Sequence, residues 1–198
     1  MRTSGAIERP GNPRRGGCAS RPRSARRGFS LIELIIGLAV LSLLLAVGVP
    51  AFQSWVINSQ IRNSAEAVLN GIQLARANAI QQNHLVVFNL TPDNSGTPAS
   101  WWVRLDGSNT DIQAWSGAEG AANTVMTPAT GTRVTYNGLG KRVANSDGSD
   151  MLTQLDVTSS ASSSPEIRAL RIVVGTSGSA KMCDPDPVLI AHGDPRAC

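Results

Sequence analysis

The sequence predicts an α+β fold in which a long N-terminal helix packs on a C-terminal head made of an antiparallel β-sheet. Residues 34–61 contain no charged side chain, which favours a long apolar helix. The following twenty residues place apolar side chains at helical spacing. The remainder consists of short β-branched and aromatic runs separated by turn-forming residues, a pattern typical of antiparallel strands.

The first half of the predicted helix is long enough to span a membrane. Residues 34–57 would extend about 36 Å as a helix, and a bilayer core is about 30 Å thick. Glu33 stands at the start of this run. An ionisable group beside an apolar membrane segment is costly, so Glu33 is predicted to be functional.

The second half of the helix is amphipathic. Apolar side chains recur every three or four residues, which predicts one buried stripe along a helix that runs from about residue 30 to residue 81. Asn83 and His84 are predicted to end it. The stripe consists of Ile57, Ile61, Ala65, Val68, Ile72, Ala75 and Ala79.

The head, residues 84–198, is predicted to be β-rich. Residues 91–100 are expected to form a turn, and the serine-rich residues 159–164 are expected to form a loop. Strands are predicted at residues 85–90, 101–105, 112–115, 132–138 and 166–175.

Charge divides the chain into two parts. Residues 1–28 hold eight arginines and one acid, whereas residues 29–198 hold ten basic and thirteen acidic side chains, a net charge of −3. Positive charge that flanks an apolar helix is retained in the cytoplasm, so the arginines indicate membrane topology. A basic arm that binds nucleic acid is the alternative interpretation.

The segment Gly28-Phe29-Ser30-Leu31-Ile32-Glu33 resembles the cleavage motif of type IV prepilins and type II secretion pseudopilins. The resemblance implies that a membrane peptidase cuts after Gly28 and that the new N-terminal Phe29 is methylated. It also makes Glu33 the fifth residue of the mature chain and Pro50 the 22nd, where such helices bend. Because this cut precedes the apolar run, the helix is retained, unlike a secretory signal.

Assembly is the role that this resemblance implies for Glu33. An unpaired charge buried in a bundle of apolar helices costs several kcal/mol. The α-amino group of Phe29 on a neighbouring subunit is the expected counter-charge, and the pair would form in only one axial register. A solvated, idle carboxylate near the headgroups is the alternative.

Cysteine use indicates an exported head. Cys18 is expected to leave with the leader, so Cys183 and Cys198 remain as a pair. In an oxidising compartment a disulfide between them is expected. Two reduced thiols, or half of a metal site with His192 and Asp184, are the alternatives.

The C-terminal segment around these cysteines resembles that of minor pilins of the FimT/FimU type, within the GspH/FimT pseudopilin group. FimT-like members bind DNA through Gly-Arg-x-Arg before the first cysteine. Here residues 178–181 read Gly-Ser-Ala-Lys, which leaves Lys181 as the one basic side chain. A mature charge of −3 also lacks the basic face that phosphate binding needs, which disfavours DNA as a partner.

No catalytic apparatus is recognisable in the sequence. It contains no nucleophile-elbow serine motif, paired-carboxylate pattern or phosphate-binding loop, and residues 138–141 are interpreted as a turn. Trp101, Trp102 and Trp115 are expected to fill the core and rim of the sheet, with a binding surface as the alternative. We therefore expect a non-enzyme with neither a cofactor nor a resident metal.

These features predict a minor pilin that enters, and helps to prime, a type IV pilus. A GspH-like pseudopilin of type II secretion is the first alternative, and a FimT-like DNA-binding pilin the second. Expected partners are the prepilin peptidase, other minor pilins or pseudopilins, the major subunit and the bacterial inner membrane. The expected regions are a cleaved leader (1–28), a transmembrane and assembly segment (29–57), an amphipathic helical segment (58–83) and a periplasmic head (84–198).

Overall fold

The computed structural model describes residues 28–93, 98–121, 123–161 and 166–198. The leader with Cys18, the centre of the turn expected at residues 91–100 and part of the serine-rich loop lie outside the described residues. The described part of the chain divides into two units between residues 42 and 43.

Helix α1 (Leu31–Gln82) is a single element of 52 residues, close to the predicted 30–81. Every side chain from residue 31 to residue 50 is exposed. By length and composition, α1 is the one helix among the described residues that is apolar enough to cross a membrane. Pro50 lies inside it and cannot donate the backbone hydrogen bond that a helix interior normally requires. Asn83, with φ of 48°, adopts the left-handed conformation that ends helices.

The predicted apolar stripe is confirmed as the face of α1 that packs on the head. Ile57 is partly buried, and the other six stripe residues are at most 1% exposed. Alanine at three of these positions keeps the stripe shallow, so the helix backbone lies close to the strands.

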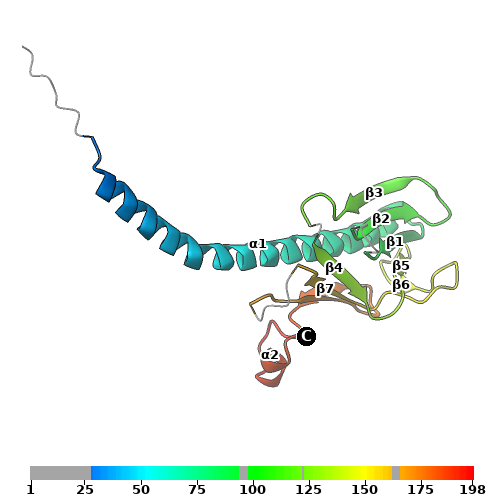
Figure 1. The fold of residues 1–198 in the computed structure, drawn as a ribbon. Helices are drawn as coiled ribbons and strands as arrows, with labels where there is room; N and C mark the ends of the chain where they lie inside the picture. The colour runs from blue at the N-terminus through cyan, green and yellow to red at the C-terminus, as the bar shows by residue number, and fades with distance from the viewer. Residues whose placement is uncertain (1–27, 94–97, 122, 162–165) are drawn as a thin grey trace, which may run out of the picture. The chain divides into compact units, whose positions relative to one another are not determined.

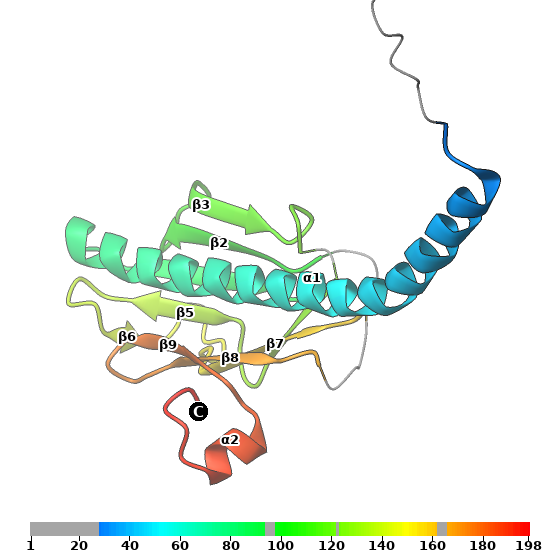
Figure 2. The same ribbon diagram turned by 90° about the vertical axis from the view of Figure 1, so that its left-hand side faces the viewer.

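The head contains two antiparallel sheets, where the sequence predicted one (Figure 1). Figure 2 shows the cyan and green part of α1 lying over the strands of the head and running roughly along β2 and β5. The first sheet has the order β3-β2-β1-β5-β6, with β1 (Val86–Thr91), β2 (Ser100–Leu105), β3 (Asp111–Ser116), β5 (Arg133–Tyr136) and β6 (Arg142–Val143). The second has the order β4-β7-β8-β9, with β4 (Thr124–Pro128), β7 (Gln154–Ser159), β8 (Leu170–Val174) and β9 (Ala180–Cys183).

Both sheets and the helical stripe share one hydrophobic core. Strand alternation places Phe88 and Trp101 from the first sheet in this core, together with Leu155 and Ile172 from the second. A buried hydrogen bond of 3.1 Å between the hydroxyls of Ser64 on α1 and Thr124 on β4 is among the polar contacts within it.

The strands at residues 85–90, 101–105, 112–115 and 132–138 correspond to β1, β2, β3 and β5. The prediction for residues 166–175 was too long, because β8 begins at Leu170. Asn58 on α1 holds the preceding segment instead: its side-chain amide donates to the Glu166 carbonyl and accepts from the Arg168 N–H, both at 2.9 Å. Strands β4, β6, β7 and β9 were not predicted.

The three tryptophans of the first sheet lie in the core or at its rim. Trp101 is 3% exposed, and its ring centroid lies 5.7 Å from that of Phe88. Trp115 packs against the core. Trp102 points to the other face of β2, where the Arg104 guanidinium lies 4.2 Å from the ring centroid. These positions agree with the expected filling of core and rim.

Gly71 is required where α1 meets the first sheet. A Cβ at this position would lie 2.9 Å from Phe88 Cε2 and 3.0 Å from the Trp101 ring. Alanine adds up to about 1 kcal/mol of helix propensity, but overpacking a core costs about 1–3 kcal/mol. We expect Gly71→Ala to lower the stability of the head by about 1 kcal/mol in thermal melts, whereas Asn70→Ala on the exposed face should not. A higher melting temperature for Gly71→Ala would show that the two rings move aside easily.

Candidate functional site

The N-terminal motif forms a capping box at the start of α1. The Ser30 N–H donates to Glu33 Oε2 at 2.9 Å, and the Glu33 N–H donates to Ser30 Oγ at 3.2 Å. The Ser30 hydroxyl also lies 3.1 Å from Glu33 Oε2. Sequence reasoning missed this role, although Ser-x-x-Glu before an apolar run is its recognised signature.

The capping box gives Glu33 a partner within its own chain. Its carboxylate accepts hydrogen bonds at the helix N-terminus, where a negative charge also interacts favourably with the helix dipole. Assembly through an intersubunit pair would therefore have to compete with Ser30. Immediately before the box, Gly28 is exposed and Phe29 is 89% exposed, so the bond between them lies at the surface.

A set of exposed apolar side chains begins within the motif and continues along α1. A surface of this extent is unusual for a soluble monomer and indicates contact with lipid or with other chains. Its large members are Leu31, Ile32, Leu34, Ile35, Ile36, Leu38, Val40, Leu41, Leu43, Leu44, Leu45, Val47, Val49, Phe52 and Trp55.

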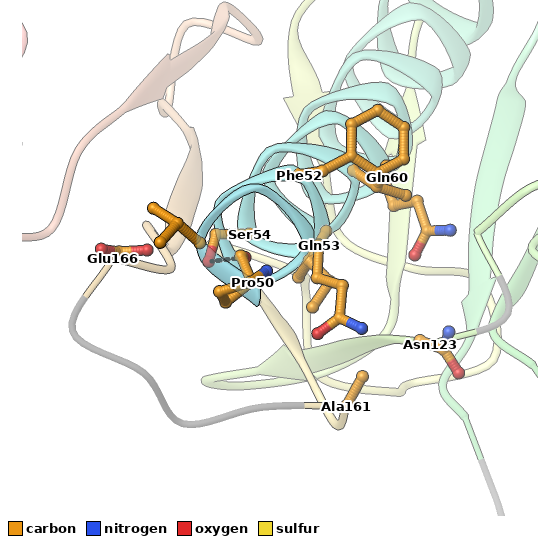
Figure 3. A pocket seen from close by; sticks show the side chains of 11 residues that line it. Pro50, Phe52, Gln53, Ser54, Gln60, Asn123, Ala161 and Glu166 are labelled. Carbon is orange, nitrogen blue, oxygen red and sulfur yellow. Dashed lines mark hydrogen bonds between the residues drawn. The ribbon is translucent and has the colours of Figure 1, made fainter. Parts of the chain in front are cut away.

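A pocket of about 930 Å³ lies beside the part of α1 that follows Pro50 (Figure 3). Figure 3 shows the Gln53 and Gln60 amides pointing toward the side of the pocket that carries Asn123. Among the described residues, Gln60 Oε1 has no hydrogen-bond partner. Glu166 is the only described lining residue with a titratable side chain. The pocket therefore offers amide hydrogen bonds and apolar contact, and its described lining supplies no acid–base pair.

The C-terminal loop is closed by a disulfide between Cys183 and Cys198, whose Cα atoms are 5.1 Å apart. Its ends are also joined by backbone hydrogen bonds, from the Asp184 N–H to the Arg196 carbonyl at 2.7 Å and from the Cys198 N–H to the Asp184 carbonyl at 3.1 Å. Both thiols form this bond, so neither is available as the thiolate ligand that the alternative zinc site requires.

This loop contains regular structure that was not predicted from the sequence. It contains α2 (Pro187–Ala191), which lies on the same side of the head as β7 in Figure 1. Asp186 caps the helix by accepting a 2.9 Å hydrogen bond from the Val188 N–H. Pro187 occupies the first turn, where its missing N–H costs nothing.

Lys181, the candidate DNA contact, is exposed on β9. Gly178, at the start of the same segment, has a structural role: its φ is 85°, and a Cβ there would lie 2.3 Å from the Gly140 carbonyl oxygen. The glycine at the start of this segment is therefore explained by the turn that precedes β9. Residues 138–141 also form a turn, closed by a 2.8 Å hydrogen bond from the Gly140 N–H to the Asn137 carbonyl.

Comparison with known proteins agrees with this architecture. A family described as "Type II transport protein GspH" matches residues 64–178, and a "Prokaryotic N-terminal methylation motif" matches residues 23–49. Two relatives from Pseudomonas aeruginosa, each named "Fimbrial protein", are 28% identical over 106 residues, covering 52% of this chain and 68% of the relative.

A crystal structure of the type IV minor pilin FimU from Pseudomonas aeruginosa is similar, with a TM-score of 0.46 and 16% identity over 63% of this chain and 88% of FimU.

The methylation motif implies processing by a prepilin peptidase, and the apolar helix after it indicates membrane anchoring. Because the GspH match covers more than half of the 198 residues, the chain belongs to the GspH family of type IV pilin-like proteins, which are structural proteins that assemble with other pilins.

Proposed function

We propose that this chain is a minor pilin that enters a type IV pilus, and helps to prime its assembly, after prepilin peptidase removes residues 1–28. The main support for this proposal is the Gly28-to-Glu33 motif at the start of a 52-residue helix. The side chains of this helix are exposed from residue 31 to residue 50. The relatives named "Fimbrial protein" support the pilus as the destination.

In this proposal the arginine-rich leader stays in the cytoplasm, in accordance with the positive-inside rule. Residues 29–57 span the inner membrane, residues 58–83 form the helical face that packs on the head, and residues 84–198 form the periplasmic head. The Cys183–Cys198 disulfide supports this placement, because such bonds persist in oxidising compartments. In the filament, neighbouring minor pilins and the major subunit replace lipid around the apolar helix.

Cleavage after Gly28 provides a direct test. We expect intact mass measurement of the membrane-bound protein to give a chain that begins at Phe29 and carries a methyl group on its α-amino nitrogen. Gly28→Ala should leave the leader attached, because the peptidase must accommodate the residue before the cut. Gly37→Ala, at a helical position where a Cβ meets nothing within 4 Å, is the matched control and should be processed normally. A mature wild-type chain that still begins at Met1 would contradict the proposal.

A pseudopilin of type II secretion is the second candidate, favoured by the "Type II transport protein GspH" match. Deletion of the gene distinguishes the two. We expect the deletion to remove surface pili, measured by shearing and immunoblotting of the major subunit, while the secretion of exoproteins into the medium stays normal. Loss of secretion with normal piliation would identify the pseudopilin instead.

A further inference from the structure

A second cleft lies where α1 leaves its apolar run, beside the C-terminal loop. Its volume is about 560 Å³, and arginines from three segments line it: Arg62 on α1, Arg168 before β8 and Arg196 in the disulfide-closed loop. Leu170 and Met182, both partly buried against the core, contribute an apolar floor. We call this feature the arginine cleft.

The three guanidinium groups are only partly neutralised. Arg168 forms no ion pair with any described residue. Arg62 lies 3.5 Å from Glu66, but the two side chains are 68% and 52% exposed, and such exposed pairs are weak. The cleft therefore presents guanidinium groups that can still donate hydrogen bonds to an anion.

Arg196 has the strongest pairing of the three. It donates to both carboxylate oxygens of Asp194, at 3.0 and 2.8 Å, and these hydrogen bonds lower the pKa of Asp194 to about 2. Its side chain is nonetheless 67% exposed. Asp184 is the one acidic side chain in the lining, so the lining itself carries three positive charges against one negative charge. Glu66 and Asp194, the ion-pair partners of Arg62 and Arg196, lie outside the lining and neutralise these two arginines in part.

The position of the cleft along α1 places it next to the lipid headgroups when the apolar run spans the membrane. Arg62 is the first charged residue after Glu33, and helical side chains lean toward the N-terminus, here toward the apolar run. Asn58 holds the backbone at Arg168 one turn closer to that run. Trp55 is 66% exposed and lies one turn before Asn58, as expected for an interfacial aromatic residue. The span from Asn58 to Arg62 is about 6 Å, which matches a headgroup layer of about 5–7 Å on each side of the bilayer.

We propose that the arginine cleft binds the phosphate of an anionic phospholipid of the periplasmic leaflet while the subunit waits in the membrane. The guanidinium groups hold the phosphate oxygens, and Leu170 and Met182 contact the glycerol end of the acyl chains. The inference rests on α1 spanning the membrane, as proposed above. Its consequence is that the head is seated on the bilayer before assembly, and that extraction into a filament releases the lipid.

The test uses the full-length chain in vesicles of phosphatidylcholine containing about one third phosphatidylglycerol. After gentle transfer to detergent, native mass spectrometry counts the phospholipids retained by each protein molecule. We expect one phosphatidylglycerol to be retained preferentially. The double variant Arg62→Gln/Arg168→Gln should weaken retention about fivefold for each guanidinium removed. Lys141→Gln/Lys181→Gln, which removes two exposed charges outside the cleft, should not.

Several controls separate this proposal from its alternatives. Alkaline extraction of the vesicles checks that each variant is inserted, so a failure of membrane spanning is visible separately from a failure of lipid binding. Arg62→Lys/Arg168→Lys keeps the charge and should retain most of the lipid. If Lys141→Gln/Lys181→Gln lost as much lipid as Arg62→Gln/Arg168→Gln, the cleft would be overturned as the binding site.

Competition identifies the source of the phosphate. Millimolar inorganic phosphate and a short DNA duplex should both leave the lipid bound. Displacement by either one would show a general anion site and overturn the assignment to lipid. Unchanged lipid retention in the glutamine variant, with loss of filament incorporation, would show that the cleft contacts a neighbouring subunit instead.

Discussion

Glu33→Leu is expected to abolish incorporation into filaments while leaving membrane insertion intact. Removing the carboxylate makes insertion easier, because a polar group leaves the edge of an apolar run. Incorporation should fail because the charged N-terminus of a neighbouring Phe29 would then be buried without its counter-charge, at a cost of several kcal/mol. Shearing of filaments followed by immunoblotting measures incorporation, and alkaline extraction measures insertion.

The capping box makes a sharper comparison possible. Glutamine can also fill the third position of a capping box, so Glu33→Gln keeps the local hydrogen bonds to Ser30 and removes only the charge. Ser30→Ala removes the side-chain hydrogen bonds of the cap and keeps the charge of Glu33. Losing the cap costs about 1 kcal/mol of helix stability. We expect Glu33→Gln to fail like Glu33→Leu, and Ser30→Ala to retain incorporation. Normal incorporation of Glu33→Gln would mean that Glu33 acts as a cap and that no intersubunit charge pair is needed.

Cys198→Ser is expected to destabilise the head by about 2–5 kcal/mol, the usual cost of removing a disulfide from a small exported domain. Cys183 ends β9, which is an edge strand paired only with β8 in its sheet. The disulfide ties this edge to Cys198 and so holds the loop that follows β9 against the sheet. Thermal melts of the full-length protein in detergent should show a melting temperature lower by about 10 °C.

Two comparisons check the cause of that loss. Cys183→Ser/Cys198→Ser should match the single variant, since either change removes the same bond. Reductant should lower the melting temperature of the wild type and leave the double variant unaffected. Alkylation of the folded, oxidised protein should modify neither Cys183 nor Cys198. An unchanged melting temperature in both variants would show that the backbone hydrogen bonds of Asp184 hold the loop without the covalent link.

The N-terminal helix was the part of the structure most accessible from the sequence. Its apolar run and its stripe at Ile61, Ala65 and Val68 depend on the spacing of neighbouring residues, which a helix converts directly into one face. The strands around Phe88 and Trp101 were predicted for a similar reason, because they combine β-branched and aromatic side chains with nearby turn residues. The capping box of Ser30 and Glu33 is equally local, because its Ser-x-x-Glu signature stands directly before the apolar run.

The head depended on contacts between segments that are distant in the sequence. Its division into two sheets follows from which strands pair, and no local pattern encodes that choice. The segment before Leu170 has apolar side chains typical of a strand, yet Asn58, more than one hundred residues earlier, takes its backbone hydrogen bonds. The convergence of Arg62, Arg168 and Arg196 is of the same kind: a sequence fixes the spacing of charges along one helix, whereas only folding brings charges from three segments to one cleft.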